Sequence, residues 1–377
     1  MTRKHTPLAW IAFAALLATP LSAQTPSRRD RGRAIDSIVE AARTARSIPG
    51  VAVAVVRGSD TILIRGYGLA DVENDVAMTP DAVFQIASVS KQFTAAAILR
   101  LAEQGRLSLD DDLTRFMPDF VTSGRHVTLY HLLAHTHGMQ EYNRPEVHGQ
   151  LALPFGHQRF LELMKDQPFD FPVGERYLYR NTGYYFAAMI VEQLGGREGS
   201  TGGGAGPITS RRFGDYLAEQ LFEPAGLVST SDCRDRPVVR RRVHGYGTED
   251  DHLVNAAPLH WSWALGVGSL CSTVRDLVRW NAALHGGRIL EPATYQRMIT
   301  PATLNDGSRT QYGLGLGIGE LAGRRLIAHG GGAPGFSTNL AYFPDEQLTI
   351  AVLTNLETGQ AGVITRDIAA VALGKQP

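Results

Sequence analysis

The chain has 377 residues, of which 44% are hydrophobic and 20% are charged, an ordinary composition for a globular protein. Its 37 Lys and Arg residues equal its 37 Asp and Glu residues in number. This balance argues against a nucleic-acid-binding surface and against a polybasic membrane surface, so we expect no nucleic-acid partner.

The N-terminus has the pattern of a secretory signal. Arg3 and Lys4 precede an apolar run, residues 8–17, which is too short to cross a bilayer as a helix, and small residues follow it. Assigning residues 1–23 to a signal peptide, with cleavage after Ala23, predicts export to the periplasm or the extracellular space. The processed chain would then have no stable membrane span, whereas a retained anchor is the alternative.

The hydrophobic pattern predicts strands at both ends of the chain and helices between them. Near the N-terminus we expect a helix at 30–47 and a hairpin of strands at 51–56 and 61–64. Residues 83–106 hold a buried helix that begins near Ser88, and the further helical segments are 129–134, 158–165, 182–194, 213–221 and 273–284. The C-terminal third predicts strands at 312–318, 325–328, 339–343 and 349–353, with a turn at 345–346, and a closing helix at 363–373.

This order predicts an α/β fold of the α+β type. The two ends would join into one antiparallel sheet flanked by helices, and the middle of the chain would form an inserted, mostly helical lobe. We assign residues 24–85 and 255–377 to the sheet lobe and residues 86–254 to the helical lobe. The glycine-rich stretch 195–206 is interpreted as a flexible surface loop, because neither a preceding strand nor a following Gly-Lys-Ser/Thr supports a phosphate-binding loop.

Cys233 and Cys271 are the two cysteines of the chain. Export would permit a disulfide between them. The sequence does not show whether they pair, and we favour two buried thiols that pack as small hydrophobic side chains.

The segment Ser88-Val89-Ser90-Lys91 begins a long apolar stretch that continues through residues 93–102. At positions i and i+3 of a helix, Ser88 and Lys91 would be neighbours, with Cβ atoms about 5–6 Å apart. A serine hydroxyl becomes a good nucleophile when a base takes its proton, and lysine is such a base only after its surroundings remove its own proton. Because the helix should be buried, its lysine must be paired, neutral or in a cleft.

Three further segments accompany this pair: residues 132–139 (LLAHTHGM) at a helix end, Tyr179-Arg180-Asn181 in a loop, and His329-Gly330-Gly331 at the end of a predicted strand. In order and spacing the four segments resemble the serine β-lactamase and penicillin-binding-protein-like superfamily, over almost all of the mature chain. The pattern is most similar to class C β-lactamases, DD-peptidases of that type, and related esterases and D-aminopeptidases. Residues 84–88 (FQIAS) and 179–185 (YRNTGYY) look very like the family consensus.

The resemblance implies catalytic roles for three residues. Ser88 would be the acylated nucleophile, Lys91 would share its proton transfers, and Tyr179 would act with Lys91 as base before donating to the leaving group. Which of the two groups starts neutral is left open, because such a pair titrates together. Asn181 would contact the substrate amide and hold Lys91.

The third motif would supply the strand beside the substrate. His329 and Gly331 would lie on that strand, and the backbone N–H groups of Ser88 and Gly332 would form the oxyanion hole, in which two fixed donors typically contribute a few kcal/mol. The motif departs from class C β-lactamases, which usually have lysine and threonine where His329 and Gly330 stand. The lost cation and hydroxyl would grip a substrate carboxylate, so an ester or a less acidic peptide is favoured over a β-lactam or D-Ala-D-Ala.

The sequence therefore predicts an exported serine hydrolase that acts through an acyl-enzyme on an ester, amide or β-lactam bond. Its partner would be a small molecule or a short peptide, and neither a cofactor nor a metal ion is implied. A β-lactamase or D-Ala-D-Ala carboxypeptidase proper is one alternative. A non-catalytic peptidoglycan- or peptide-binding protein of the same fold is another.

Two segments of the sequence allow other interpretations. His131, His135 and His137 could bind a metal ion, since the first two are spaced i, i+4, but no Glu follows the first histidine. Residues 329–332 (HGGG) look like the oxyanion loop of α/β-hydrolases, but no Gly-x-Ser-x-Gly pentapeptide follows them, so that fold is rejected. Arg180 could replace the lost cation or point into solvent.

Overall fold

The computed structural model describes residues 27–196, 212–234 and 236–374. The predicted signal peptide and most of the predicted glycine-rich loop lie outside the described residues. Within them, no helix has both the length and the hydrophobicity that crossing a bilayer requires.

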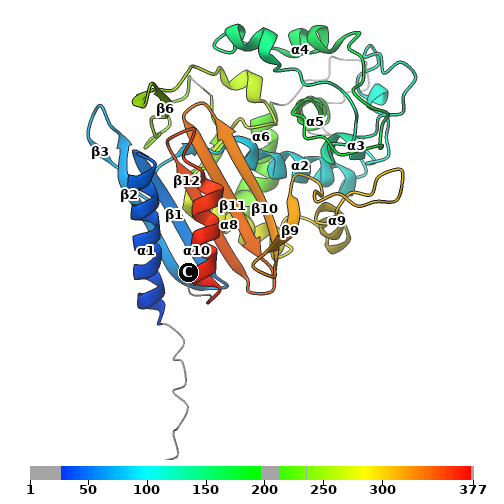
Figure 1. Ribbon diagram of the computed structural model, residues 1–377. Coiled ribbons are helices and arrows are strands. Elements are labelled where there is room, and N and C mark those ends of the chain that lie inside the picture. The colour runs from blue at the N-terminus through cyan, green and yellow to red at the C-terminus, as the bar shows by residue number, and fades with distance from the viewer. Residues whose placement is uncertain (1–26, 197–211, 235, 375–377) are drawn as a thin grey trace, which may run out of the picture.

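The two ends of the chain form one antiparallel sheet of seven strands in the order β3-β2-β1-β12-β11-β10-β9 (Figure 1). This confirms the predicted fold class. The seven strands are β1 (Gly50–Arg57), β2 (Asp60–Asp71), β3 (Val76–Ala77), β9 (Gly317–Leu321), β10 (Arg324–Ala333), β11 (Phe336–Phe343) and β12 (Leu348–Thr354). The N-terminal hairpin joins the C-terminal strands where β1 pairs with β12, from Val51 opposite Thr354 to Arg57 opposite Leu348.

Both faces of this sheet are buried because both carry helices. In β1, Val51, Val53 and Val55 pack toward helices α1 (Arg28–Ala45) and α10 (Ala361–Ala372), which contact each other. The intervening Ala52 and Ala54 belong to the core on the other face, where α8 (Val274–His285) contacts β1 and β12. Because successive side chains of a strand point to opposite faces of the sheet, β1 contributes alternate residues to two hydrophobic cores.

The middle of the chain builds a helical region around two buried helices. Helix α2 (Lys91–Glu103) packs against α5 (Thr182–Leu194), and both are buried over most of their length. The remaining helices are α3 (Leu129–Leu133), α4 (His157–Met164), α6 (Phe213–Leu217), α7 (Glu223–Ala225) and α9 (Pro292–Met298), with a π-helical segment at Ala218–Phe222 and short 3-10 turns at Ala87–Ser90, Leu113–Arg115, Pro145–Gln150 and Trp261–Ala264.

Small strands connect the sheet to the helical region. A three-stranded sheet has the order β4 (Phe84–Gln85), β8 (Leu270–Ser272) and β5 (Ser231–Asp232), and a hairpin is formed by β6 (Tyr246–Glu249) and β7 (His252–Asn255). A disulfide joins Cys233, just after β5, to Cys271 of β8. The favoured interpretation of two free thiols was therefore wrong.

Two strand predictions need correction. The strand expected at 312–318 begins only at Gly317, because the alternating glycines before it form turns, one of them with Gly315 at φ +77°. His329 was expected to end a strand, but β10 continues through the glycines to Ala333, paired with β11. The predicted turn at 345–346 is confirmed, since β11 ends at Phe343 and β12 starts at Leu348.

Candidate active site

Ser88 lies in a tight 3-10 turn, Ala87–Ser90, directly before α2. The preceding Ala87 has φ +46°, a left-handed conformation that costs an alanine conformational energy and is maintained by its surroundings. The turn is held on both sides: Ile86 N–H donates to Leu270 O of β8 (3.0 Å), and the Thr338 hydroxyl of β11 donates to Ile86 O (2.9 Å). Two sheets thus fix the orientation of the serine.

Lys91 is fully buried and its ammonium group has three partners. Nζ lies 3.0 Å from Ser88 Oγ, 2.9 Å from Asn181 Oδ1 and 3.1 Å from the Val267 carbonyl oxygen. Burial lowers the pKa of Lys91 to about 7, and the charge of Glu141 opposes that fall. The predicted serine–lysine pair is therefore present, with the amine near half-ionisation at neutral pH.

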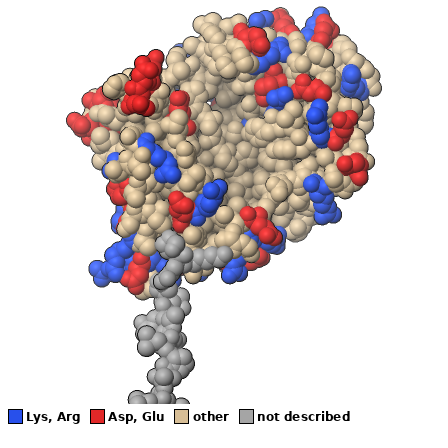
Figure 2. All heavy atoms as spheres, viewed as in Figure 1, with Lys and Arg blue, Asp and Glu red and all other residues tan. Residues whose placement is uncertain are grey.

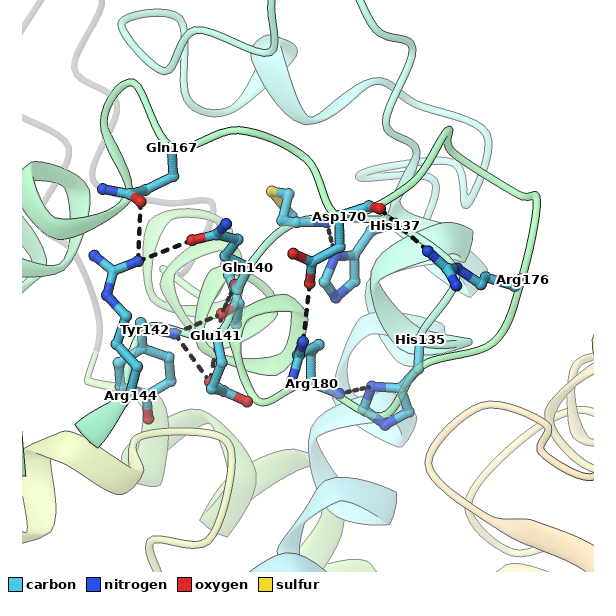
Figure 3. Close-up of polar contacts among 12 residues, drawn as sticks. His135, His137, Gln140, Glu141, Tyr142, Arg144, Gln167, Asp170, Arg176 and Arg180 are labelled. Carbon is cyan, nitrogen blue, oxygen red and sulfur yellow. Dashed lines mark hydrogen bonds and ion pairs between the residues drawn. The ribbon is translucent and has the colours of Figure 1, made fainter. Parts of the chain in front are cut away.

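Asn181 stands at the N-terminal end of α5 and is held from behind by Glu141. The Asn181 backbone N–H donates to Glu141 Oε2 at 2.6 Å, and Tyr142 N–H donates to the other carboxylate oxygen at 3.0 Å. Figure 3 shows the Glu141 carboxylate beside Tyr142. The same view shows the ion pair between Arg180 and Asp170. Burial raises the pKa of Glu141, against the effects of these hydrogen bonds and of Lys91.

Tyr179 lies over the same pair. Its ring centroid is 4.9 Å from Lys91 Nζ. Its hydroxyl is buried without a well-aligned hydrogen bond to any of the described residues. Burial raises the pKa of Tyr179 above its usual value, and interaction with the Ser88 side chain partly opposes the rise. Three of the predicted groups, Ser88, Lys91 and Tyr179, are thus brought together in the structure.

His329 is buried, and both nitrogens of its ring have partners. The Tyr312 hydroxyl donates to His329 Nε2 (2.9 Å), and His329 Nδ1–H donates to the Gly330 carbonyl oxygen (2.6 Å). Burial lowers the pKa of His329 to about 4, so the ring is neutral at physiological pH. The His329 ring lies beside Tyr179, with ring centroids 6.1 Å apart.

The glycines after His329 bring β10 close to the nucleophile. A Cβ on Gly331 would lie 2.5 Å from Ile86 O and 2.3 Å from Thr338 Oγ1, so only glycine fits between β10 and the Ser88 turn. Gly332 is exposed and lines the same pocket as Ser88. Strand β9 pairs with β10 only as far as Ala328, so among the described strands the outer edge of β10 has no partner from His329 onward. This edge can accept an extended substrate.

A pocket with a neutral lining opens directly beside Ser88. None of the described residues that line it is charged. Its lining includes Ser88, Asn181 and Gly332, together with the aromatic residues Tyr142, Trp261 and Trp263. Figure 2 shows a hollow in this face of the molecule, with the Lys, Arg, Asp and Glu side chains around it and not at its centre. The pocket suits an uncharged apolar or aromatic group.

Arg180 does not replace the missing cation, because its Nη2 lies 2.9 Å from Asp170 Oδ2. The histidines considered as metal ligands are also engaged separately. His135 Nδ1 accepts from Arg180 N–H, and His137 Nδ1 accepts from Met139 N–H (Figure 3). No group of three His, Cys, Asp or Glu among the described residues could hold a metal ion.

Sequence reasoning missed three residues of this site. Glu141 supports Asn181, Tyr312 holds His329, and His135 contacts Tyr179 with the two rings tilted and their centroids 4.3 Å apart. His135 has φ +57° and is completely buried. The sequence signal was available only for His135 and Glu141, since both lie in or just after the segment 132–139 that carried the resemblance.

This combination of fold and site defines a serine hydrolase of the β-lactamase and penicillin-binding-protein class. Residues 35–374 match the family model described as Beta-lactamase, and the chain belongs to that family. The predicted superfamily is confirmed.

Two curated relatives are D-aminopeptidases. The D-aminopeptidase of Brucella ovis is 30% identical over 339 residues, covering 87% of this chain and 60% of the relative. That of Brucella anthropi is 29% identical over 338 residues, covering 86% of this chain and 59% of the relative. The chain therefore spans about 60% of the length of the curated relatives that it matches.

Solved structures show the same fold. The octameric penicillin-binding protein homologue from Pyrococcus abyssi superposes with a TM-score of 0.77 at 25% identity, covering 91% of this chain and 77% of that one. The D-amino acid amidase from Ochrobactrum anthropi SV3, complexed with D-phenylalanine, superposes with a TM-score of 0.76 at 22% identity, covering 91% and 99%.

Proposed function

We propose that this chain is an exported serine hydrolase that cleaves an ester or amide bond of a small, uncharged substrate, with an apolar or aromatic group in the pocket, through an acyl-enzyme at Ser88. The three partners of Lys91 are the observation that carries the proposal. Two of them, Asn181 Oδ1 and Val267 O, can only accept hydrogen bonds. A neutral amine has two N–H groups, which these oxygens occupy, so its lone pair is left facing the Ser88 hydroxyl.

Acylation then needs no rearrangement of the base. Neutral Lys91 takes the Ser88 proton across 3.0 Å as Oγ attacks the carbonyl carbon of the substrate. Negative charge develops on the carbonyl oxygen, which would accept from the backbone N–H groups of Ser88 and Gly332. Loss of one such donor typically lowers the rate by about 100- to 1000-fold.

Acylation is completed with Tyr179 as the proton donor. Its pKa is raised and that of Lys91 is lowered, so at neutral pH the phenol keeps its proton while the amine can lose one. Its hydroxyl, which makes no well-aligned hydrogen bond to the described residues, can donate to the leaving group. Lys91, protonated during acylation, then passes its proton to the Tyr179 oxygen, which makes the amine neutral again. A water molecule gives a proton to this amine as it attacks the acyl-enzyme, and that proton returns to Ser88 Oγ as the acid product leaves.

The pocket indicates the class of substrate. A D-aminopeptidase substrate carries a free amino group, and D-Ala-D-Ala or a β-lactam carries a carboxylate. The described residues that line this pocket offer a charged partner to neither. The indole of Trp261, half-exposed, and the buried Trp263 instead offer flat apolar surfaces. This favours an uncharged ester or amide, with aminopeptidase activity as the second candidate because of the relatives' names.

Export is supported by the sequence of residues 1–23 and agrees with a disulfide between Cys233 and Cys271, which persists best in oxidising compartments.

The function is tested by intact-mass analysis with a fluorophosphonate. We expect one adduct on the wild-type protein and none on Ser88→Ala, and release of p-nitrophenol from uncharged aromatic esters. A wild-type protein that forms no adduct and hydrolyses nothing in a panel of esters, D-amino-acid amides and cephalosporins would support a non-catalytic binding protein. Efficient turnover of D-amino-acid amides alone would support the second candidate.

A further inference from the structure

Glu141 lies behind the nucleophile pair and takes no part in the chemistry proposed above. It follows α3 in a loop, and it is half-buried. Its carboxylate does not line the pocket beside Ser88. It accepts from the backbone of Asn181 at 2.6 Å, and the Asn181 side chain in turn accepts from Lys91 at 2.9 Å.

We propose that Glu141 is a positioning residue for the Ser88–Lys91 pair, which fixes Asn181 against the amine and supplies the negative charge that sets how readily Lys91 gives up its proton. The inference rests on the proposed function of that pair. Two independent contacts carry it. One is the backbone bond to Asn181, and the other is the bond from Tyr142 N–H, through which the same carboxylate holds a wall of the pocket.

The other groups that face Lys91 do not set its charge near neutral pH. His329 and His135 are both buried, and burial lowers their pKa values, to about 4 for His329, so both stay neutral above that range. The rings of Tyr179 and Tyr184 lie 4.9 Å and 5.5 Å from Nζ, and burial raises the pKa values of both. Glu141 is therefore the carboxylate whose charge acts on the amine.

The negative charge of Glu141 determines the direction in which the pKa of Lys91 moves. A negative charge near Lys91 favours the protonated amine and raises its pKa, against the effect of burial. Arg180 also acts on Glu141, but it is paired with Asp170. Without the Glu141 charge, Lys91 would be neutral at a lower pH. The acid limb of the pH–rate profile, where Ser88 reactivity rises with pH, would therefore move to lower pH.

The test measures the rate of inactivation by a fluorophosphonate from pH 5 to pH 9, because this reports on Ser88 and its base without a natural substrate. For Glu141→Gln we expect a lower maximal rate, since one of its two acceptors becomes a donor, together with an acid limb shifted down by roughly one pH unit. Glu141→Asp keeps the charge one methylene farther away and should give a smaller downward shift.

Asp170→Asn is the matched control. It removes a neighbouring carboxylate that pairs with Arg180, and it should leave the limb in place (Figure 3). An unmoved limb in Glu141→Gln would overturn the proposal, however slow the variant is, and so would an equal shift in Asp170→Asn. If Glu141→Gln does not fold, Glu141→Asp decides alone, because a limb at or above the wild-type position contradicts the inference. A wild-type protein that is not labelled overturns the proposed function and this inference with it.

Discussion

The side chains of Lys91 and Asn181 are joined by a 2.9 Å hydrogen bond, although they are 90 residues apart in the chain. Lys91 begins α2 and Asn181 precedes α5, and these two helices pack against each other. The contact brings the Ser-x-x-Lys and Tyr-x-Asn segments into one site. Helix packing in the core is therefore what assembles the catalytic groups.

The first prediction concerns the three central groups. Ser88→Ala should abolish hydrolysis of p-nitrophenyl esters while circular dichroism and thermal unfolding stay those of the wild type. Lys91→Ala should lower kcat by roughly 1000-fold or more, and Tyr179→Phe by about 100-fold, because each removes a proton-transfer step. The Lys91→Ala/Tyr179→Phe double variant should be little worse than Lys91→Ala, and full additivity would show that the two groups act separately.

The second prediction is a pH dependence. The pKa of Lys91 is about 7, and the neutral amine is the active form, so kcat/KM should rise as the pH rises through about 7. His329, with a pKa lowered to about 4, is neutral throughout this range and should leave no step there. A kcat/KM that falls as pH rises from 6 to 8 would mean that the protonated amine is the active form.

Much of the fold and the centre of the site could be predicted from the sequence. The apolar runs of β1 and β12 and the longer apolar stretches of α2 and α5 are local patterns, and Ser88, Lys91 and Tyr179 stand in short motifs. The surroundings of the His329 side chain could not be predicted, for a physical reason. Its side chain is oriented by Tyr312, 17 residues earlier, and a hydrogen bond between separate segments leaves no periodic signal. The pairing of Cys233 with Cys271 depends on the alignment of β5 and β8, which is equally non-local.

The third prediction follows from the orientation of His329. His329→Lys would place a second cation in a buried position near Lys91, and would leave the Tyr312 hydroxyl without its acceptor. We expect the free energy of unfolding in urea to fall by roughly 3 kcal/mol or more, with no gain in binding of carboxylate-bearing substrates. Gly330→Lys puts the same charge at an exposed position of the same strand and should cost far less. A stable His329→Lys protein that binds such substrates better would contradict this orientation.

The fourth prediction concerns the disulfide. Cys233 and Cys271 are 38 residues apart, and their bond ties β5 to β8. Strand β8 pairs in turn with β4, which directly precedes the Ser88 turn. Replacing both with alanine should lower the free energy of unfolding by about 2–4 kcal/mol in the loop-closure model. Dithiothreitol should destabilise the wild type by a similar amount and leave the double variant unchanged. Equal stability of the wild type with and without the reductant would show that the bond is absent or without effect.

The fifth prediction tests the pocket. Trp261 lines it and is half-exposed, whereas Trp263 is buried and stacks on Phe155 with ring centroids 3.7 Å apart, so Trp261 is the indole that can be removed without opening the core. Trp261→Ala should lower kcat/KM for p-nitrophenyl phenylacetate roughly tenfold, or about 1.4 kcal/mol, mainly through KM. The same variant should hydrolyse p-nitrophenyl acetate almost normally, because an acetyl group is too small to reach the indole, and Trp261→Phe should retain most of the preference. If Trp261→Ala lowers the rates for both esters equally, Trp261 supports the structure of the site and does not select the substrate.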